Sequence, residues 1–359
     1  MSNGALDPQG KPLGTDFISF WSASSLALKG QPEAAYDTVL HYRVEQYVAG
    51  NDDIPYYHWS YPPTFLAMVL PLALLPYLWS LFSWLALTLA AYAAVMWRIA
   101  PRIDMLWIAL AFPAVLINLG HGQNGFLSTA LFGGAMLLLE RRPLLAGVAI
   151  GLLVFKPQLG VLIPLALIAG GHWKTFSSAT LASVLFVLGT LILFGVDAWT
   201  GFIAAVQGAS QLMEQDTIGW EMTQSIFSAV RLLGGDVTMA YAAQAVVFVL
   251  AAGSVIYAWR APVGINIKAA VLVTGGLLAT PHLLGYDLVL LALPIIWLTL
   301  EGLRTGFLDG EKFVLLLAWL LPLVSRTVAS EVHLSLAPLV IAALLLVCLR
   351  RIRVDQVNA

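Results

Sequence analysis

The chain has 359 residues, of which 60% are apolar and only 11% are charged, and its formal net charge is -2. Water-soluble domains carry about a quarter charged residues, so the composition excludes a soluble globular protein, and the negative charge argues against a nucleic-acid partner. Apolar runs near 20 residues, the length that crosses a ~30 Å hydrocarbon layer as a helix, recur along most of the chain. The sequence therefore predicts an all-α polytopic protein, multi-pass in the plasma or inner membrane, and no metal or cofactor motif is found in it.

Residues 1–60 form a polar segment in which acidic side chains outnumber basic ones. Cytoplasmic loops favour lysine and arginine, so this acidic segment is expected on the outer side of the membrane. Within it, Phe17 to Leu28 has helical apolar spacing and is followed by a glycine that suits a helix end. The stretch Ala34 to Val48 is predicted to form a second short amphipathic helix that lies on the interface.

From Tyr61 onward, the apolar runs predict about eleven crossings joined by short connections. These crossings are expected at 62–76, 79–97, 104–119, 124–139, 144–170, 175–195, 237–258, 265–283, 286–300, 312–328 and 332–349. The run 144–170 is too long for one untilted crossing and too short for two, so one helix kinked at Pro157 is predicted. The chain is thus divided into an external segment at 1–60, an N-terminal transmembrane module at 61–195, a second external loop at 196–236 and a C-terminal transmembrane module at 237–359.

The basic residues near the C-terminus, Arg350, Arg351 and Arg353, are expected in the cytoplasm. Counting back through eleven crossings places residues 1–60 outside, in agreement with their acidic charge. The second external loop and the turn 281–287 then fall on the same side as residues 1–60, and we expect the three segments to converge. The same count leaves four basic loop residues outside, against the usual bias: Arg98, Arg102, Arg141 and Arg142.

Asp16 precedes the first apolar helical run, and two roles are open for it. An aspartate in this position commonly caps the backbone N–H groups of a helix, and the pattern alone favours that role. Alternatively, a carboxylate beside Thr15 and an aromatic pair, at the edge of a membrane, is suited to act as a general base. The second role requires an acceptor hydroxyl within reach of the carboxylate.

Lys156 lies inside an apolar run, followed by Pro157. A lysine near the middle of a membrane costs about 2.5–3.5 kcal/mol on insertion scales, and such residues are by default candidates for a functional site. A lysine that reaches toward an interface, or one paired for structural reasons, is an equally good interpretation. If Lys156 is functional, it suits an anion such as a lipid-linked phosphate.

Other polar residues have a structural and a functional interpretation as well. The turn with Gln123 and Asn124 contains ordinary turn residues, but it also fits a loop that dips into a cavity lined by protein. His282 and Asp287 share a turn, where they are suited either to cap helix ends or to bind a sugar and tune a proton transfer. The guanidinium of Arg231 matches phosphate, yet an interfacial arginine needs no ligand.

A set of short motifs, taken in their order and spacing from Gly14 to the 280s, resembles the family 87 membrane glycosyltransferases. The motifs are Gly14-Thr15-Asp16-Phe17-Ile18-Ser19-Phe20-Trp21, Gly30 with Tyr36-Asp37, Tyr61-Pro62-Pro63, Pro71-Leu72, Leu75-Pro76, Gly122-Gln123-Asn124 and Lys156-Pro157. That family has the GT-C fold and includes mannosyltransferases that depend on polyprenyl-phosphate-mannose. The resemblance therefore implies a GT-C-like helical bundle with two external loop segments.

The resemblance also implies a reaction. The donor would be mannose or a similar hexose on polyprenyl phosphate, and the acceptor a glycan or lipid on the extracytoplasmic side. Asp16 would be the catalytic base of an inverting displacement that needs no metal. The remaining binding residues predicted for the donor and its lipid phosphate are Lys156, Arg231, His282, Asp287, Gln123, Asn124 and Tyr61.

The sequence departs from the family pattern at one place, because GT-C enzymes have a span before the first external loop, whereas Met1 here is followed directly by polar residues. Two alternatives to a glycosyltransferase therefore stay open. A transporter or flippase for a lipid-linked glycan would use the same polar residues without a base, although the spans show no evident inverted repeat. The other alternative is a truncated homologue without catalytic activity.

Overall fold

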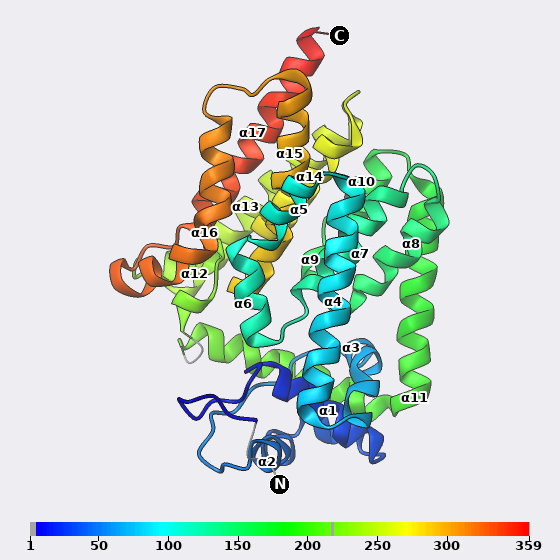
Figure 1. The fold of residues 1–359 in the computed structure, drawn as a ribbon, viewed down its shortest axis with the longest axis vertical. Helices are drawn as coiled ribbons and strands as arrows, with labels where there is room; N and C mark the ends of the chain where they lie inside the picture. The colour runs from blue at the N-terminus through cyan, green and yellow to red at the C-terminus, as the bar shows by residue number, and fades with distance from the viewer. Residues whose placement is uncertain (1–4, 217–218, 359) are drawn as a thin grey trace.

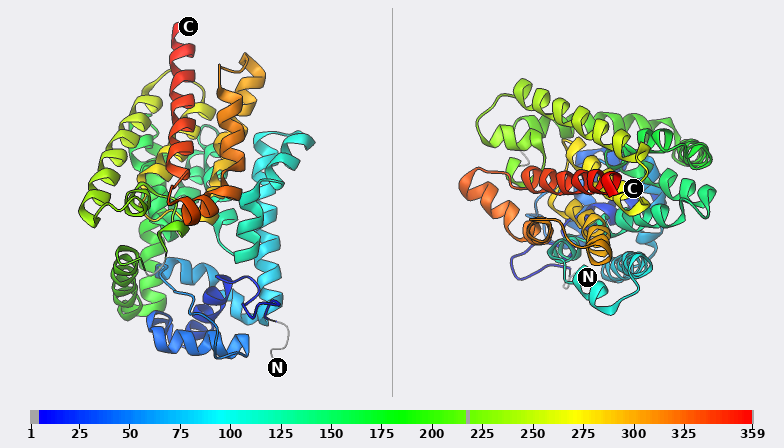
Figure 2. Two further views of the ribbon diagram at one scale, coloured as in Figure 1. Left: turned by 90° about the vertical axis from the view of Figure 1, so that its left-hand side faces the viewer. Right: turned by 90° about the horizontal axis from the view of Figure 1, so that it is seen from above.

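The structure is a computed structural model that describes residues 5–216 and 219–358. Over these ranges it contains no β-strand, only two isolated bridges, Leu6 with Pro12 and Thr223 with Leu284. The prediction of an all-α protein is confirmed. Figure 1 shows the N-terminal elements gathered at one end of an elongated helical bundle and the C-terminus at the other, and Figure 2 shows the same separation from the side. We call these two ends the head face and the tail face.

The head face is formed by α1 (Phe17–Leu28), the 3₁₀-helix η1 (Pro32–Tyr36) and α2 (Thr38–Ala49), so both short helices predicted for this segment are present. Local chemistry explains where α2 begins and ends. The side chain of Asp37 accepts hydrogen bonds from the backbone N–H groups of Val39 and Leu40, each at 2.9 Å, which satisfies donors that have no partner inside the helix. Gly50 ends the helix in the left-handed conformation at φ 65°.

The remaining elements follow in chain order. They are α3 (Pro63–Val69), η2 (Leu70–Leu74), α4 (Tyr77–Ile99), α5 (Ile103–Leu110), α6 (Pro113–His121), α7 (Gly125–Leu138), α8 (Pro143–Leu152), η3 (Leu153–Phe155), α9 (Pro157–Gly160), α10 (Ile163–Ala169), α11 (Trp173–Glu214), η4 (Trp220–Met222), α12 (Ile226–Leu232), α13 (Val237–Arg260), α14 (Ile265–Ala279), η5 (Gly285–Leu291), α15 (Ala292–Thr305), α16 (Glu311–Val332) and α17 (Ala337–Asn358).

Within the described ranges, 5 helical segments are long and apolar enough to cross a membrane, or up to 6 if the bent pair of α5 and α6 counts as one crossing. The two members of that pair meet at 51°. Other apolar helices have only 10–17 residues. The structure thus supports a multi-pass membrane protein, but it does not confirm the predicted count of eleven crossings.

The segment 62–76, predicted as the first crossing, packs beside α1 at the head face. Trp21 donates from its indole to the carbonyl of Leu75 at 3.0 Å, and Ser24 donates to the carbonyl of Leu70 at 2.7 Å. At 1.5 Å per residue, even the full stretch Pro63–Leu74 would be about 18 Å long, well short of the hydrocarbon thickness. Because both ends of this segment lie near the head face, it does not carry the chain across.

The prediction of a single kinked helix at 144–170 is wrong. The chain breaks at η3 and Lys156, and α8 and α11 lie side by side in parallel. A Cβ on Gly147 would meet Ser178, and a Cβ on Gly151 would meet Ala182, so residue numbers rise together along both helices. Both helices therefore begin at the same face, and α8 to α10 form a re-entrant hairpin with Lys156 at its tip. Pro157 fits this break, because its ring disfavours helical geometry in the preceding residue.

These two corrections change the side assigned to the loops between them. Tyr77 starts α4 at the head face, where its hydroxyl donates to the carbonyl of Leu13 at 2.6 Å, so the 23 residues of α4 carry the chain to the tail face. The loops with Arg98, Arg102, Arg141 and Arg142 consequently join the tail face (Figure 1). Their basic side chains then lie at the same end as the basic C-terminal helix, and the conflict found in the sequence disappears.

Helix α11 turns sharply at Gly195, whose φ of 77° and ψ of 174° are not helical. The part that follows Gly195 packs on the head face, where the ring centres of Tyr36 and Phe202 lie 6.4 Å apart in an edge-to-face arrangement. A Cβ on Gly201 would lie 3.0 Å from the Cβ of Tyr36, so glycine permits this close approach. Much of the predicted second external loop is therefore helix that covers the head.

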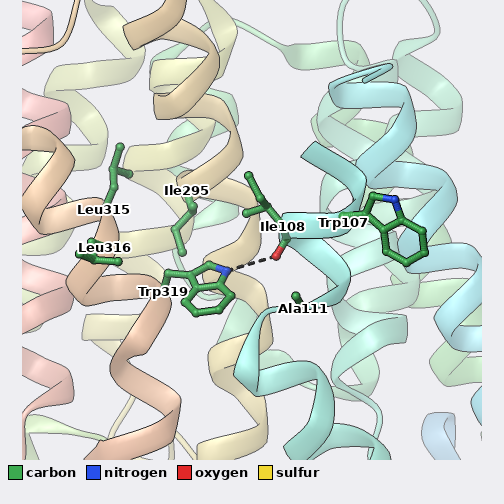
Figure 3. Close-up of a pocket in the computed structure, with 7 residues that line it drawn as sticks. All are labelled: Trp107, Ile108, Ala111, Ile295, Leu315, Leu316 and Trp319. Atoms are coloured by element: carbon green, nitrogen blue, oxygen red, sulfur yellow. Dashed lines mark hydrogen bonds between the residues drawn. The ribbon is translucent and has the colours of Figure 1, made fainter. Parts of the chain in front are cut away.

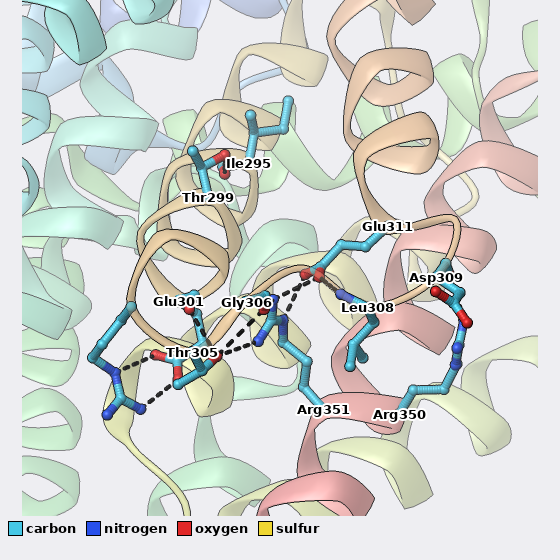
Figure 4. A network of polar contacts seen from close by, with 11 residues as sticks. Ile295, Thr299, Glu301, Thr305, Gly306, Leu308, Asp309, Glu311, Arg350 and Arg351 are labelled. Atoms are coloured by element: carbon cyan, nitrogen blue, oxygen red, sulfur yellow. Dashed lines mark hydrogen bonds and ion pairs between the residues drawn. The ribbon is translucent and has the colours of Figure 1, made fainter.

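Side chains of the tail face include a buried ion pair between α16 and α17 (Figure 4). The guanidinium of Arg351 donates to the two carboxylate oxygens of Glu311 at 2.5 and 2.6 Å, and both side chains are at most 3% exposed. Arg351 also donates to Thr305 and to the carbonyl of Gly306, each at 3.1 Å. Glu311 accepts from the backbone of Leu308 at 2.8 Å, so the pair closes the loop between α15 and α16.

An open apolar groove lies between α5, α15 and α16 (Figure 3). The indole of Trp319 donates across it to the carbonyl of Ile108 at 3.2 Å, which satisfies the one polar atom that the ring carries. The residues that line the groove are Trp107, Ile108, Ala111, Ile295, Leu315, Leu316 and Trp319. Because its lining is apolar, this groove offers contact with hydrocarbon and no chemistry.

Candidate active site

Asp16 lies where the head meets the bundle. Its backbone N–H donates to the carbonyl of His121, the last residue of α6, at 3.1 Å. Just before it, Gly14 turns the chain with a φ of 66°. A Cβ on Gly14 would lie 2.6 Å from Leu81, so glycine is required both by the turn and by the packing on α4. Backbone contacts thus fix Asp16 against a segment more than 100 residues away.

The side chain of Asp16 makes no capping hydrogen bond to α1, so the structural role favoured by the sequence pattern is not the one observed. Its Oδ2 instead accepts a hydrogen bond from the amide of Gln123 at 2.9 Å. The carbonyl oxygen of that amide accepts from the hydroxyl of Tyr61 and from the backbone N–H of Asn124, each at 3.1 Å. Two donors on the oxygen fix the amide with its NH₂ group toward Asp16.

His121 lies beside the carboxylate, with its Nδ1 3.8 Å from Oδ1 of Asp16 and 2.7 Å from the hydroxyl oxygen of Thr15. The side chains of His121 and Asp16 are 36% and 28% exposed, so both reach the surface of the head. The sequence points to the turn that begins at His121, but no separate role was predicted for this histidine. Its signal was the polar position at the end of an apolar helix, next to Gln123.

The turn at 121–125 is held by Asn118, which the sequence analysis missed. The amide of Asn118 donates to the carbonyl of Gln123 at 3.1 Å and accepts from the N–H of Gly125 at 2.9 Å. Gly122 adopts a φ of 64°, and a Cβ there would lie 2.6 Å from the Cβ of Phe17. A fully buried asparagine inside an apolar helix was the available signal, because such a group must have partners.

Below this turn lies a second layer. Lys156, at the tip of the re-entrant hairpin, donates to Oδ1 of Asp287 at 2.5 Å and to the side-chain oxygen of Asn124 at 3.0 Å. Its ammonium group also lies 4.9 Å from the centre of the Tyr286 ring. Both charged side chains are at most 3% exposed. The structure thus brings together five predicted residues around Asp16: Tyr61, Gln123, Asn124, Lys156 and Asp287.

The other two predicted residues have different surroundings. Arg231 donates to the carbonyls of Gly235 and Glu214 at 2.8 and 3.2 Å, and its guanidinium lies 4.3 Å from the centre of the Trp220 ring. All three partners belong to the predicted second external loop, so Arg231 links different parts of that loop to one another. His282 is half-buried in the turn before η5, where its backbone N–H donates to Thr280 at 3.2 Å.

The turn with His282 does meet the second external segment, as expected. The backbone N–H of Gln224 donates to the carbonyl of Leu283 at 2.6 Å, and Thr223 forms a bridge with Leu284. On the other flank of the head, the second half of α11 packs on Tyr36. The predicted convergence of the external segments at the head face is confirmed.

A buried pair of ionisable groups lies under α1. Nε2 of His41 is 3.1 Å from the carbonyl of Ser19, and its Nδ1 is 3.5 Å from Oε1 of Glu45. Burial raises the pKa of Glu45 to about 9 and lowers the pKa of His41 to about 4. Near neutral pH both groups are therefore uncharged, and Glu45 accepts a hydrogen bond from the backbone N–H of Tyr57 at 3.0 Å.

Comparison with protein families decides the class of this chain. A family model described as glycosyltransferase family 87 matches residues 59–281. The chain belongs to glycosyltransferase family 87. No curated protein and no solved structure matches it.

Membership of family 87 makes the chain a membrane glycosyltransferase, whose substrates are a sugar donor and an acceptor. The matched region contains Tyr61, Gln123, Asn124 and Lys156, whereas Asp16 precedes it. The case for Asp16 within this family 87 chain therefore depends on the contacts that join it to the matched region. Chief among these is the hydrogen bond from Gln123.

Proposed function

We propose that this family 87 enzyme transfers mannose or a similar hexose from polyprenyl phosphate to a glycan or lipid acceptor, on the extracytoplasmic side of the membrane. The observation that supports this most strongly is the carboxylate of Asp16. One of its oxygens is held by Gln123 at 2.9 Å, and the side chain is 28% exposed at the surface of the head. A base with a fixed orientation and access for a substrate hydroxyl is what direct displacement at a sugar requires.

In the proposed reaction, the acceptor hydroxyl attacks the anomeric carbon from the side opposite the phosphate. Asp16 takes the hydroxyl proton as the new carbon–oxygen bond forms. The bond between the anomeric carbon and the phosphate oxygen breaks, and its electron pair leaves with polyprenyl phosphate. Because phosphate is a good leaving group and the attack is direct, the anomeric configuration inverts and neither a metal nor a general acid is needed.

The charge distribution supports the proposed orientation of the membrane protein. Basic side chains at the ends of the spans gather at the tail face, and cytoplasmic loops favour lysine and arginine. These residues include Arg98, Arg102, Arg141, Arg142, Lys174, Arg260, Arg304, Lys312, Arg350, Arg351 and Arg353. We therefore place the tail face in the cytoplasm and the head face, with Asp16, on the outer side.

The binding roles predicted for the other residues stay predictions, and the contacts rank them. Gln123 and Tyr61 lie one and two hydrogen bonds from the carboxylate of Asp16, respectively, so they are suited to contact the sugar. Arg231 and Lys156 already have partners for their cationic groups. We assign the contact with the leaving phosphate to His121, which is 36% exposed beside Asp16.

The test is a transfer assay with purified protein and polyprenyl-phosphate sugars in detergent, where no two compartments exist. We expect the wild-type protein to consume the donor and to form an inverted glycoside, whereas a flippase would leave the donor intact. Asp16→Asn should reduce kcat by about 10²–10⁴-fold, while the exposed control Asp53→Asn should match wild type. Intact donor with the wild-type protein would refute the proposed function, and full turnover by Asp16→Asn would refute the assignment of the base.

A further inference from the structure

Lys156 and Asp287 come from the two halves of the bundle, 131 residues apart in sequence, and meet below the site. Lys156 occupies the tip of the re-entrant hairpin, between η3 and α9. Asp287 lies in η5, which follows α14. The ammonium group lies 2.5 Å from the carboxylate oxygen, and the two side chains are 3% and 1% exposed. Each charge thus neutralises the other away from solvent.

Stability alone does not account for such a pair. Removing two charges from water costs so much that replacing a buried ion pair with apolar side chains of similar volume is often neutral or stabilising. A buried ion pair among apolar helices of a membrane protein is therefore a candidate for a functional role. The question is then which part of the molecule its hydrogen bonds hold in place.

The hydrogen bonds of this pair lead to the candidate base. Lys156 donates to the side chain of Asn124 at 3.0 Å. The backbone N–H of Asn124 donates to the side chain of Gln123 at 3.1 Å, and Gln123 holds Asp16 at 2.9 Å. On the other side, Oδ2 of Asp287 accepts from the N–H of Leu284 at 3.3 Å. The pair therefore joins the turn after α6 to the turn before η5.

Packing makes this connection stiff. A Cβ on Gly125 would lie 2.5 Å from the side chain of Asn118, 2.7 Å from Val289 and 2.9 Å from the carbonyl of Tyr286. The turn after α6 is thus pressed against η5 with no room for one more carbon atom. A small displacement of Asp287 would consequently be passed to Gln123 and, through it, to Asp16.

We propose that Lys156 and Asp287 are a positioning pair, which aims the carboxylate of Asp16 through Asn124 and Gln123 and does not contact the phosphate of the donor. This inference depends on the proposed function, in which Asp16 is the base. A misplacement of a reacting group by about 1 Å can cost about 10²-fold in rate. The pair should therefore affect kcat far more than the KM for the donor.

The experiment compares two double variants that replace a buried ion pair with apolar side chains. Lys156→Met with Asp287→Leu removes the pair below the site, and Arg351→Met with Glu311→Leu removes the pair at the tail face as a matched control. Single variants leave an unpaired buried charge and are expected to fold poorly, which is why the double variants are used. We expect both doubles to keep a thermal midpoint close to wild type in detergent.

For Lys156→Met with Asp287→Leu, kcat should fall about 10²-fold with little change in the KM for the polyprenyl-phosphate sugar, while the tail-face double keeps wild-type kcat. Wild-type kcat in the first double would show a purely structural pair, and a large rise in KM would show a phosphate contact. Either result overturns the inference. Donor left intact by the wild-type protein is a separate outcome, because it refutes the proposed function.

A second measurement does not need activity. Without the pair, the backbone N–H of Asn124 should exchange with solvent deuterium about tenfold faster than in wild type, as for the loss of one net hydrogen bond. The tail-face double should leave this exchange unchanged. Unchanged exchange at Asn124 in the first double would overturn the inference whatever the enzyme transfers.

Discussion

The two buried ion pairs, Lys156 with Asp287 and Arg351 with Glu311, are shielded from solvent to the same degree, yet they hold different parts of the molecule. All four side chains are at most 3% exposed, and in each pair the closest nitrogen–oxygen distance is 2.5 Å. In the tail-face pair, Arg351 donates its other hydrogen bonds to a loop, at Thr305 and Gly306. In the pair below the site, Lys156 donates a further hydrogen bond to the side chain of Asn124. Burial therefore does not separate a structural ion pair from a functional one, whereas the remaining partners do.

The largest expected change in stability comes from breaking the tail-face pair on one side only. Arg351→Met leaves the carboxylate of Glu311 buried without its cation, which should lower the free energy of unfolding by about 3–5 kcal/mol. The activity of each folded molecule should not change, because the loop between α15 and α16 is remote from the head face (Figure 1). Thermal unfolding in detergent and kcat per folded protein check both parts. A fall in kcat at unchanged folded fraction would erase the contrast between the pairs.

Gln123→Ala tests the last connection to the base. It removes the amide that holds Asp16 at 2.9 Å and leaves the hydroxyl of Tyr61 without its acceptor. We expect kcat to fall about 10²-fold, equivalent to about 2.7 kcal/mol. Gln46→Ala, which removes an exposed side-chain hydrogen bond of α2 at 2.8 Å, is the control. Equal kcat in the two variants would mean that Asp16 needs no positioning.

His41 and Glu45 are a third buried pair, in the head, and unlike the two ion pairs they are uncharged near neutral pH. The pKa of Glu45 is raised from 4.5 to about 9, so the folded state keeps a proton that the unfolded state releases, and stability falls as pH rises through that window. The pKa of His41 is lowered from 6.5 to about 4, so its contribution is lost as pH falls through that lower window. Between pH 6.5 and 9 only the first effect acts, at about 1.4 kcal/mol per pH unit.

Glu45→Gln cannot ionise but can still accept the hydrogen bond from the backbone N–H of Tyr57. We therefore expect its thermal midpoint to vary less with pH than that of wild type between pH 6.5 and 8.5, and to be the higher of the two at pH 8.5. The exposed Glu33→Gln should follow wild type. Parallel curves for wild type and Glu45→Gln would show that Glu45 is charged in the folded head.

The smallest effect is expected at an exposed ion pair. Arg102 and Asp104 lie 2.7 Å apart at the tail face, with side chains 52% and 50% exposed. Water and salt screen such a pair, so Arg102→Ala should leave the thermal midpoint close to that of wild type. Thermal unfolding at low and high salt measures it. A marked loss of stability would mean that the nitrogen–oxygen distance alone, without burial, predicts how strongly an ion pair stabilises the fold.

Helices could be predicted from the sequence, but their path through the membrane could not. Apolar runs mark a helix whether it crosses, lies beside the head as 63–74 does, or turns back as 143–169 does. What separates these cases is tertiary contact, such as Gly147 against Ser178. Each of the two misassigned segments was counted as one crossing that the chain does not make. Two extra crossings return the chain to the same side, so the predicted side is correct again after residue 170. For that reason the acidic and basic ends were still predicted on opposite sides.

The candidate site was predicted in part, for a similar reason. Asp16, Gln123 and Lys156 were each recognisable as polar groups in unusual surroundings. Their partners were not recognisable, because a hydrogen bond across 107 residues leaves no periodic pattern. The helix-cap pattern even favoured the wrong role for Asp16, since local rules take no account of a stronger partner brought in by the fold. Asn118 was missed, and no role was predicted for His121, because only the folded turn gives these side chains their partners.

The most direct measurement is kcat for Asp16→Asn beside Asp53→Asn, with a polyprenyl-phosphate sugar as donor in detergent. If the carboxylate held by Gln123 removes the acceptor proton, the first variant loses about 10²–10⁴-fold in kcat at a wild-type thermal midpoint, and the second loses nothing. Equal turnover by the two variants would contradict the account.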